Sequence, residues 1–320
     1  MDILFITHNR LGDAVLSTGL YNHLVERHPS AAMTVACGPV PAPLFAPAPN
    51  LERIIELAKQ PYLGHWRRLW RATAGRRWDL IVDLRGSAIA WLLRARRRYV
   101  LQPPATPLHR VAMLGALLDL DPPPAPRLWA TDAQRRAAAG LLPDDGPVLA
   151  LGPTANWGGK QWPGERFADL AGRLTAGDGI LPDARIAVFG APSERDAAAQ
   201  TLDRLPSDRV CDLVGGVDLP TLYACLQRCR LFVGNDSGLM HMAAAAGIPT
   251  LGLFGPSREV LYAPWGPRAA SVRTPQSYDD IVGHPDYDYR RHDSWMTGLD
   301  VDTVQRAAGE LMRRTAAEAA

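Results

Sequence analysis

The sequence is poor in several features that identify common classes of protein. Only two of its 35 basic residues are lysines, Lys59 and Lys160, so each lysine stands out. Its four cysteines form no CxxC pair, which argues against a zinc site. No apolar run approaches the roughly 18 residues that a membrane span needs, and the first residues lack the basic segment and cleavage site of a signal peptide. These absences predict a cytoplasmic protein.

Several motifs of nucleotide and acyl chemistry are missing as well. No GxxxxGK is followed by Ser or Thr, so a P-loop nucleotide hydrolase is disfavoured. No GxGxxG follows an expected strand, which argues against an NAD enzyme, and no GxSxG elbow indicates a serine hydrolase. No DxD motif lies beside a plausible donor loop. Any nucleotide chemistry must therefore depend on other loops.

Short runs rich in Val, Ile and Leu alternate with helical patterns along the chain, and the proline-rich stretch Asp121–Pro126 interrupts them. This alternation is typical of parallel sheets with crossover helices. We expect an α/β protein of two Rossmann-like, doubly wound parallel-sheet domains facing a central cleft, in residues 1–145 and 146–299. A closing helix in residues 300–320 could pack back on the first domain. The expected strands are Ile3–Thr7, Met33–Cys37, Arg53–Leu57, Leu80–Leu84, Tyr99–Gln102, Val148–Leu151, Arg185–Phe189, Val210–Leu213, Leu231–Gly234 and Thr250–Phe254, and the expected helices include Asp13–Arg27, Ser87–Arg96, Asp132–Leu142 and Val301–Arg314.

In open α/β sheets, ligands bind beyond the carboxyl ends of the strands. Asp13 lies in the first loop of this kind, Thr7–Thr18, at the start of a helix. It is either a helix N-cap or a general base that takes a proton from an acceptor hydroxyl. Gly12, which permits a tight turn, and Arg10 are candidates for binding the acceptor, as is Arg85, directly after another expected strand.

A glycine-rich loop, Gly152–Pro163, follows the first strand of the second half and leads into a helix. A loop of this kind before a helix N-terminus favours anions, and Lys160 adds a point charge suited to a diphosphate. The alternative is a solvated loop lysine.

The most informative stretch is Gly234–Pro249, in which a strand ends, a polar turn follows and a helix of very small residues begins. Asp236 and Ser237 could cap this helix, while the backbone N–H groups of Ser237 and Gly238 receive a phosphate. His241, about one turn into the helix, either contacts the diphosphate or is a packed histidine bonded to backbone.

At these three stretches the chain resembles glycosyltransferase family 9, the lipopolysaccharide heptosyltransferases that use ADP-heptose. The likeness covers nearly the whole length and is strongest in Leu11–Thr18, Lys160–Phe167 and Gly234–His241. It implies a GT-B fold and an inverting transfer without a metal or another cofactor. It also implies that the N-terminal domain binds the acceptor and the C-terminal domain the donor.

The resemblance implies roles for single residues too. Asp13 matches the family's proposed general base, and Lys160 matches the lysine at the donor diphosphate. Glu194 lies where the family often places an acid near the ribose hydroxyls, whereas Pro275–Met296 lacks the cysteines often seen in that region. The donor-binding candidates are Thr154, Lys160, Glu194, Asp236, Ser237, Gly238 and His241.

The predicted function is transfer of a sugar, heptose, from a nucleotide diphosphate donor, ADP-heptose, to a lipopolysaccharide-core or other lipid-linked saccharide. Two alternatives stay open: a nucleotide-sugar epimerase on a GT-B fold, and a GT-B-like binding protein without turnover. We expect Asp13 and Lys160 to act together only when the cleft between the domains closes.

Ten arginines and only two acids lie between Arg67 and Arg98, and His65–Arg71 alternates arginine with tryptophan. This stretch is either a solvated basic face or a surface that docks on the anionic inner-membrane leaflet. Nucleic acid is not an expected partner, because no recognised binding module accompanies the charge.

Overall fold

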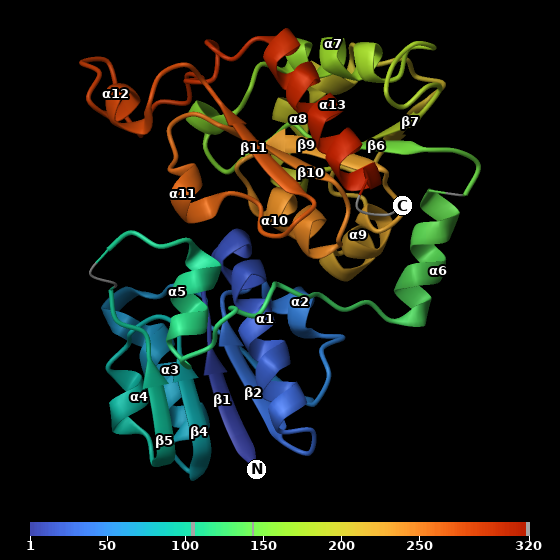
Figure 1. The fold of residues 1–320 in the computed structure, drawn as a ribbon. Coiled ribbons are helices and arrows are strands. Elements are labelled where there is room, and N and C mark those ends of the chain that lie inside the picture. The colour runs from blue at the N-terminus through green and yellow to red at the C-terminus, as the bar shows by residue number, and fades with distance from the viewer. Residues whose placement is uncertain (104–105, 143, 318–320) are drawn as a thin grey trace. The chain divides into compact units, whose positions relative to one another are not determined.

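The structure is a computed structural model that describes residues 1–103, 106–142 and 144–317. It contains two compact units, Met1–Thr131 and Asp132–Ala320 (Figure 1). The boundary predicted between residues 145 and 146 therefore lies earlier. The reason is that α6 (Asp132–Leu141) packs against α9 (Leu219–Leu226) of the second unit, which the polar sequence of α6 does not reveal.

The first unit contains a five-stranded parallel sheet with the strand order β3-β2-β1-β4-β5. Its strands are β1 (Asp2–Ile6), β2 (Ala32–Cys37), β3 (Leu51–Glu56), β4 (Trp78–Asp83) and β5 (Ala95–Val100). Its helices are α1 (Leu11–Arg27), α2 (Ala42–Phe45), α3 (Gly64–Thr73), α4 (Ile89–Leu92) and α5 (Arg110–Ala116), with a short 3₁₀ turn at Pro61–Leu63.

The alternation of side chains along β1 explains how both faces of this sheet are covered. Leu4 and Ile6 belong to a buried cluster that also contains Leu69 of α3 and Ile89 of α4. Phe5 faces the other side and contacts Tyr21 of α1, with ring centroids 5.6 Å apart. A strand buried on both faces has to be apolar at every position, as β1 is after its first residue.

The second unit contains a six-stranded parallel sheet with the order β11-β10-β9-β6-β7-β8. Its strands are β6 (Val148–Gly152), β7 (Arg185–Val188), β8 (Val210–Asp212), β9 (Leu231–Asn235), β10 (Thr250–Phe254) and β11 (Ala269–Arg273). The remaining helices are α7 (Gly164–Leu174), α8 (Arg195–Leu202), α10 (Gly238–Ala245), α11 (Glu259–Tyr262), α12 (Tyr278–Val282) and α13 (Val301–Ala317), with 3₁₀ turns at Gly158–Lys160 and Pro192–Glu194.

The closing helix α13 packs against α7, β10 and β11 of its own unit. Its buried side chains Val304, Ala308 and Leu311 join the core cluster that contains Phe167 of α7. The spacing of these three residues puts them on one face of a helix, and that face covers the sheet.

Two elements differ from the sequence-based expectation. The helix predicted over Ser87–Arg96 is wrong in its second half, because only Ile89–Leu92 is helical and the arginine-rich Ala95–Val100 forms the edge strand β5. An edge strand pairs on one side only, so it tolerates exposed Arg96 and Arg97. Strand β11 was not predicted. Among the described residues, no helix combines the length and apolar character needed to cross a bilayer.

Candidate active site

Both sheets have a point at which the winding direction reverses. In the first sheet the chain runs outward from β1 to β3 and then restarts on the other side of β1 with β4. In the second sheet the same reversal separates β6 from β9. The loops beyond the carboxyl ends of such strand pairs diverge and leave room for a ligand. The loops of Asp13, Arg85, Lys160 and Asp236 follow these four strands.

Asp13 lies in the first turn of α1, but it does not cap the helix. The N-cap residue is Arg10, and no side chain makes a capping hydrogen bond there. The Asp13 carboxylate is mostly buried and lies 3.7 Å from Nε of Arg110, at the start of α5. Because α5 packs against α1, a residue far along the sequence reaches the loop after β1. The capping interpretation of Asp13 is therefore wrong, whereas the general-base interpretation stays a prediction.

His8, Arg110 and Asp13 form one cluster. Nη2 of Arg110 lies 2.9 Å from Nε2 of His8, and a guanidinium can only donate. The Nε2 atom must therefore accept, which leaves the proton of a neutral imidazole on Nδ1. Burial, opposed by the charge of Asp13 and assisted by those of Arg110 and Arg85, lowers the pKa of His8 to about 4. His8 therefore holds Arg110 without adding charge.

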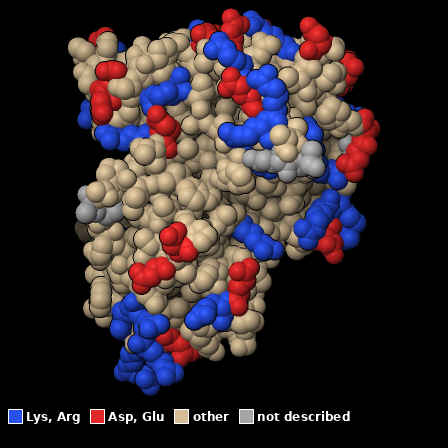
Figure 2. Space-filling model, in the orientation of Figure 1, with Lys and Arg blue, Asp and Glu red and all other residues tan. Residues whose placement is uncertain are grey.

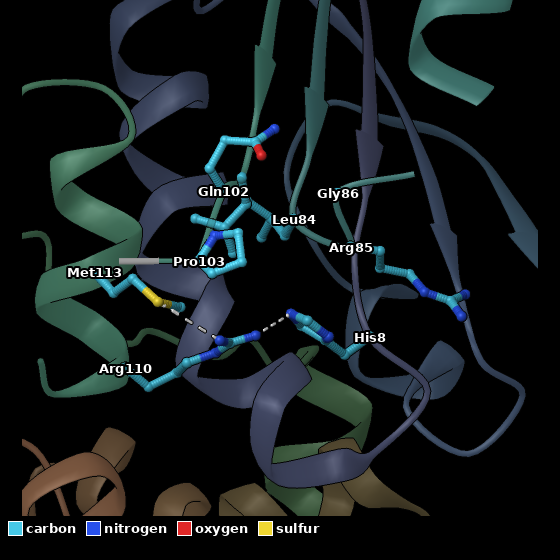
Figure 3. A pocket seen from close by; sticks show the side chains of 9 residues that line it. His8, Leu84, Arg85, Gly86, Gln102, Pro103, Arg110 and Met113 are labelled. Atoms are coloured by element: carbon cyan, nitrogen blue, oxygen red, sulfur yellow. Dashed lines mark hydrogen bonds between the residues drawn. The ribbon is translucent and has the colours of Figure 1, made fainter. Parts of the chain in front are cut away.

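A cavity of about 500 Å³ opens beside this cluster (Figure 3). His8 and Arg110 point toward each other at one side of it, whereas Arg85 extends away from both. Two guanidinium groups and a neutral imidazole make this a site suited to an anionic or hydroxyl-rich ligand. The lining residues are His8, Leu84, Arg85, Gly86, Leu101, Gln102, Pro103, Arg110 and Met113.

The other acceptor candidates differ in position. The Arg85 guanidinium is stacked 4.5 Å from the ring centroid of Trp66 and lies 3.3 Å from Oδ1 of Asn9. Gly12 lies inside the first turn of α1 and is not among the residues with positive φ, so the tight-turn role predicted for it is wrong. Arg10 is exposed at the N-cap position. Neither His8 nor Arg110 was predicted as a site residue, although His8 lies in the loop Thr7–Thr18 that also carries Asp13.

In the second unit, the structure brings Lys160 and Asp236 together. Nζ of Lys160 lies 2.5 Å from Oδ2 of Asp236, whose side chain is only 8% exposed. Asn235, the last residue of β9, fixes the loop that carries the lysine. Its Oδ1 accepts from the backbone N–H of Trp162 at 3.0 Å, and its Nδ2 donates to the carbonyl of Pro153 at 2.8 Å. Both ends of the loop are thus tied to the neighbouring strand.

Glu194 and Thr154 are also in direct contact. One oxygen of Glu194, Oε2, accepts from the Thr154 hydroxyl at 2.8 Å and from the backbone N–H of Ala191 at 2.9 Å. The carboxylate is therefore fixed beyond β7, next to the loop after β6. Among the described residues, only Oε2 of this carboxylate accepts hydrogen bonds, so Oε1 is able to accept from a ligand hydroxyl.

The turn after β9 leads directly into α10. Ser237 is the N-cap residue of α10, yet neither it nor Asp236 makes the predicted capping bond, because Asp236 is held by Lys160. Within the described part of the chain, Oγ of Ser237 is buried without a hydrogen-bond partner. A buried hydroxyl of this kind usually finds a partner, and a bound ligand would supply one. Gly238 begins α10, and His241 is buried in it.

The segment Pro275–Met296, for which no site residue was predicted, supports the lysine loop. Nε1 of Trp157 donates to the carbonyl of Arg291 at 2.6 Å, and the N–H of Gly158 donates to Nδ1 of His292 at 3.3 Å. The N–H of Trp295 donates to the carbonyl of Gly159 at 3.1 Å. A Cβ at Gly158 would lie 2.2 Å from the His292 carbonyl oxygen, so this close approach requires glycine.

The four cysteines are free thiols. Burial raises the pKa of Cys37 to about 12 and that of Cys225 to about 11, so both stay protonated and poorly reactive near neutral pH. Across residues 1–103, 106–142 and 144–317, no group of three or more His, Cys, Asp or Glu side chains is placed to hold a metal ion.

Known proteins resemble this chain in sequence and in fold. A model of glycosyltransferase family 9 (heptosyltransferase) matches residues 85–281, more than half of the chain. Lipopolysaccharide heptosyltransferase 2 of Salmonella typhimurium is 27% identical, with 88% of this chain and 90% of that protein covered. The corresponding Escherichia coli protein is 26% identical over the same shares.

Two solved structures show the same fold. A family 9 glycosyl transferase of Veillonella parvula superposes with a TM-score of 0.80 at 21% identity, covering 97% of both chains. The E. coli ADP-heptose lps heptosyltransferase II gives a TM-score of 0.77 at 22% identity, covering 98% of this chain and 99% of that one. Two Rossmann-like parallel-sheet units, matched over their full length in this way, have the GT-B fold. The chain therefore belongs to glycosyltransferase family 9, the heptosyltransferase family, and is a glycosyltransferase.

Proposed function

We propose that this glycosyltransferase moves heptose from ADP-heptose to a lipopolysaccharide-core or other lipid-linked saccharide, with inversion at the sugar carbon. The names of its relatives supply the sugar, the nucleotide and the kind of acceptor. The observation that carries the proposal is the Lys160–Asp236 pair at the strand reversal of the second sheet.

The donor half of the proposal assigns the diphosphate to Lys160 and to the turn that begins α10. The diphosphate offers Lys160 a stronger anionic partner than Asp236, and it offers the buried Ser237 hydroxyl the acceptor that it lacks. The N–H groups of Ser237 and Gly238 add the positive end of the helix dipole. Thr154 and Glu194 hold the ribose hydroxyls, and His241 supports the turn that begins α10.

The acceptor half assigns the general base to Asp13. Its carboxylate takes the proton of the acceptor hydroxyl while that oxygen bonds to the anomeric carbon and the ADP leaves from the opposite face. Arg110, held by His8, orients the carboxylate. Arg85, Arg10 and the first turn of α1 at Gly12 bind the acceptor saccharide.

We further propose that transfer needs no metal or other cofactor, because Lys160 and the N–H groups at α10 neutralise the leaving diphosphate. The enzyme then works in the cytoplasm, at the face of the inner membrane where a lipid-linked acceptor is exposed.

The test is a transfer assay with a panel of nucleotide sugars and a truncated lipopolysaccharide core, with the product identified by mass spectrometry. We expect a mass increase of one heptose with ADP-heptose only. Transfer of another sugar, or turnover of the donor to an isomer without any acceptor, would overturn the proposal.

A further inference from the structure

The outer surface of α3 and the turn before it combine positive charge with exposed apolar side chains. Arg67, Arg68 and Arg71 line a hollow of about 570 Å³ together with Gln60, Gly64 and Ala72. Within the described part of the chain, none of these three arginines forms an ion pair. No acidic residue occurs in the sequence from Leu57 to Trp78 that could neutralise them. The hollow is therefore an unpaired cationic site.

Apolar side chains border this site without being buried. Tyr62 is 94% exposed, Leu63 is 64% exposed and Trp70 is 45% exposed. Tyr62 and Leu63 both adopt the left-handed conformation, with φ values of 51° and 58°, which non-glycine residues rarely take. Two adjacent non-glycine residues in this conformation are costly to the backbone. Their large side chains are also left in solvent, and a partner with an apolar layer would account for this exposure.

The opposite side of the same helix reaches the candidate acceptor site. His65 and Leu69 are buried, Leu69 in the core cluster of the sheet. The Trp66 ring stacks on the guanidinium of Arg85, which lines the candidate acceptor cavity. Helix α3 also packs against α4, where Trp91 and Leu92 are exposed. Figure 2 shows lysine and arginine side chains gathered at the α4–β5 end of this unit, where Arg94, Arg96 and Arg97 are exposed.

We propose that this surface, defined by Tyr62, Leu63, Arg67, Arg68, Trp70 and Arg71, binds an anionic phospholipid bilayer. The arginines hold lipid phosphates in the hollow, and Tyr62, Leu63 and Trp70 enter the interfacial layer. Phosphate binding alone would not explain the exposed apolar side chains, and an apolar protein partner would not explain three unpaired arginines. The inference deepens the proposed function in one respect, because a lipid-linked acceptor lies in the same bilayer.

The experiment is vesicle flotation of the full chain without donor or acceptor, so that its result does not depend on the proposed reaction. We expect the protein to float with vesicles of phosphatidylethanolamine and phosphatidylglycerol in equal parts, to stay behind with phosphatidylcholine, and to be released by salt. The triple variant Arg67→Glu/Arg68→Glu/Arg71→Glu should lower the partition coefficient at least about a hundredfold, since each basic residue near an anionic surface contributes about a factor of five.

The matched control is Arg136→Glu/Arg306→Glu/Arg313→Glu, which changes the net charge equally at exposed positions of the second unit. It should retain most of the binding. Tyr62→Ser/Leu63→Ser should weaken binding at high salt as well as at low salt, because it removes apolar contacts. The arginine variant of α3 and the Tyr62→Ser/Leu63→Ser variant of the turn before it should both keep the melting temperature and the rate on a delipidated acceptor.

Three results would overturn the inference. The wild-type protein could remain in the aqueous fraction with anionic vesicles. The two triple variants could lose binding equally, which would show that vesicle binding depends on the net charge of the protein and not on the α3 surface. The chain could bind a nucleic acid or free glycerol phosphate but not vesicles, which would assign the hollow to another ligand.

Discussion

The proposed donor half, in the second unit, and the proposed acceptor half, in the first unit, occupy equivalent places in their own sheets, yet they are built differently. The donor half is fixed by hydrogen bonds: Asn235 holds both ends of the lysine loop, and the segment around His292 holds its middle. In the acceptor half the Asp13–Arg110 contact is long, at 3.7 Å. Within the described residues, Nε of Arg110 is buried without a hydrogen-bond partner.

This difference matches two different tasks. A rigid half binds one ligand of constant shape, such as a nucleotide diphosphate, at low entropic cost. In the acceptor half, one buried N–H of Arg110 lies beside the proposed base without a hydrogen-bond partner among the described residues, so we expect this half to gain its final geometry only when the acceptor enters. We therefore expect changes in the acceptor half to affect the rate, and changes in the donor half to affect affinity.

The largest effect is expected for Asp13→Asn. Asparagine cannot take the acceptor's proton, so kcat should fall by about 10²–10⁴-fold. Asp13 does not cap α1, so melting temperature and donor affinity should change little, and Asp13→Ala should behave in the same way. Steady-state kinetics and calorimetry with ADP measure both quantities. A stable Asp13→Asn enzyme with the wild-type rate would remove Asp13 from the mechanism.

Lys160→Ala should weaken binding of ADP by about tenfold or more, because a charge-assisted contact contributes about 1.5–3 kcal/mol. It should also lower stability, since it leaves the carboxylate of Asp236 buried and unpaired. The double variant Lys160→Ala/Asp236→Asn should recover the melting temperature but not the affinity. Recovery of both would show that Lys160 acts only as the partner of Asp236.

His8 should make the protein less stable as the pH falls. The unfolded chain takes up a proton at His8 below pH 6.5, whereas the folded chain does so only near pH 4. Stability is therefore complete above 6.5 and declines between these values by at most about 3 kcal/mol. Urea unfolding at several pH values measures the slope, and His8→Gln should flatten it. An unchanged slope in that variant would contradict the buried, neutral His8.

Gly158→Ala tests whether the segment around His292 positions the lysine loop. The new methyl group would collide with the His292 carbonyl, and such overpacking costs about 1–3 kcal/mol. The KM for the donor should rise several-fold with kcat nearly unchanged. Gly172→Ala, in α7 where nothing lies within 4 Å, is the control. An equal KM for the donor in the two variants would show that the segment around His292 does not position the lysine loop.

The smallest effect is expected from metal removal. Activity in EDTA should equal activity in buffer, because Lys160 and the N–H groups at α10 carry the charge of the diphosphate. Loss of activity that magnesium or manganese restores would contradict this.

The architecture was predictable where the signal is local. Apolar runs of strand length, separated by helical patterns, located ten of the eleven strands approximately. The eleventh, Ala269–Arg273, is half-polar and lies at a sheet edge, so neither its composition nor its periodicity distinguishes it from a loop. The pattern of Ser87–Arg96 predicts a helix throughout. Its last residues instead begin strand β5, because they pair with β4.

The sequence by itself determined which loops follow the central strands, and hence that Asp13, Lys160 and Asp236 lie at the carboxyl ends of two sheets. This result depends only on where the apolar runs of strand length end, which the sequence shows locally, and not on how the strands pair. The tertiary structure alone decided the partners: Arg110 for Asp13 and His8, and the His292 segment for the lysine loop. These residues lie about a hundred positions or more from their partners, and no periodicity encodes a contact that arises only when separate helices and loops pack on one sheet.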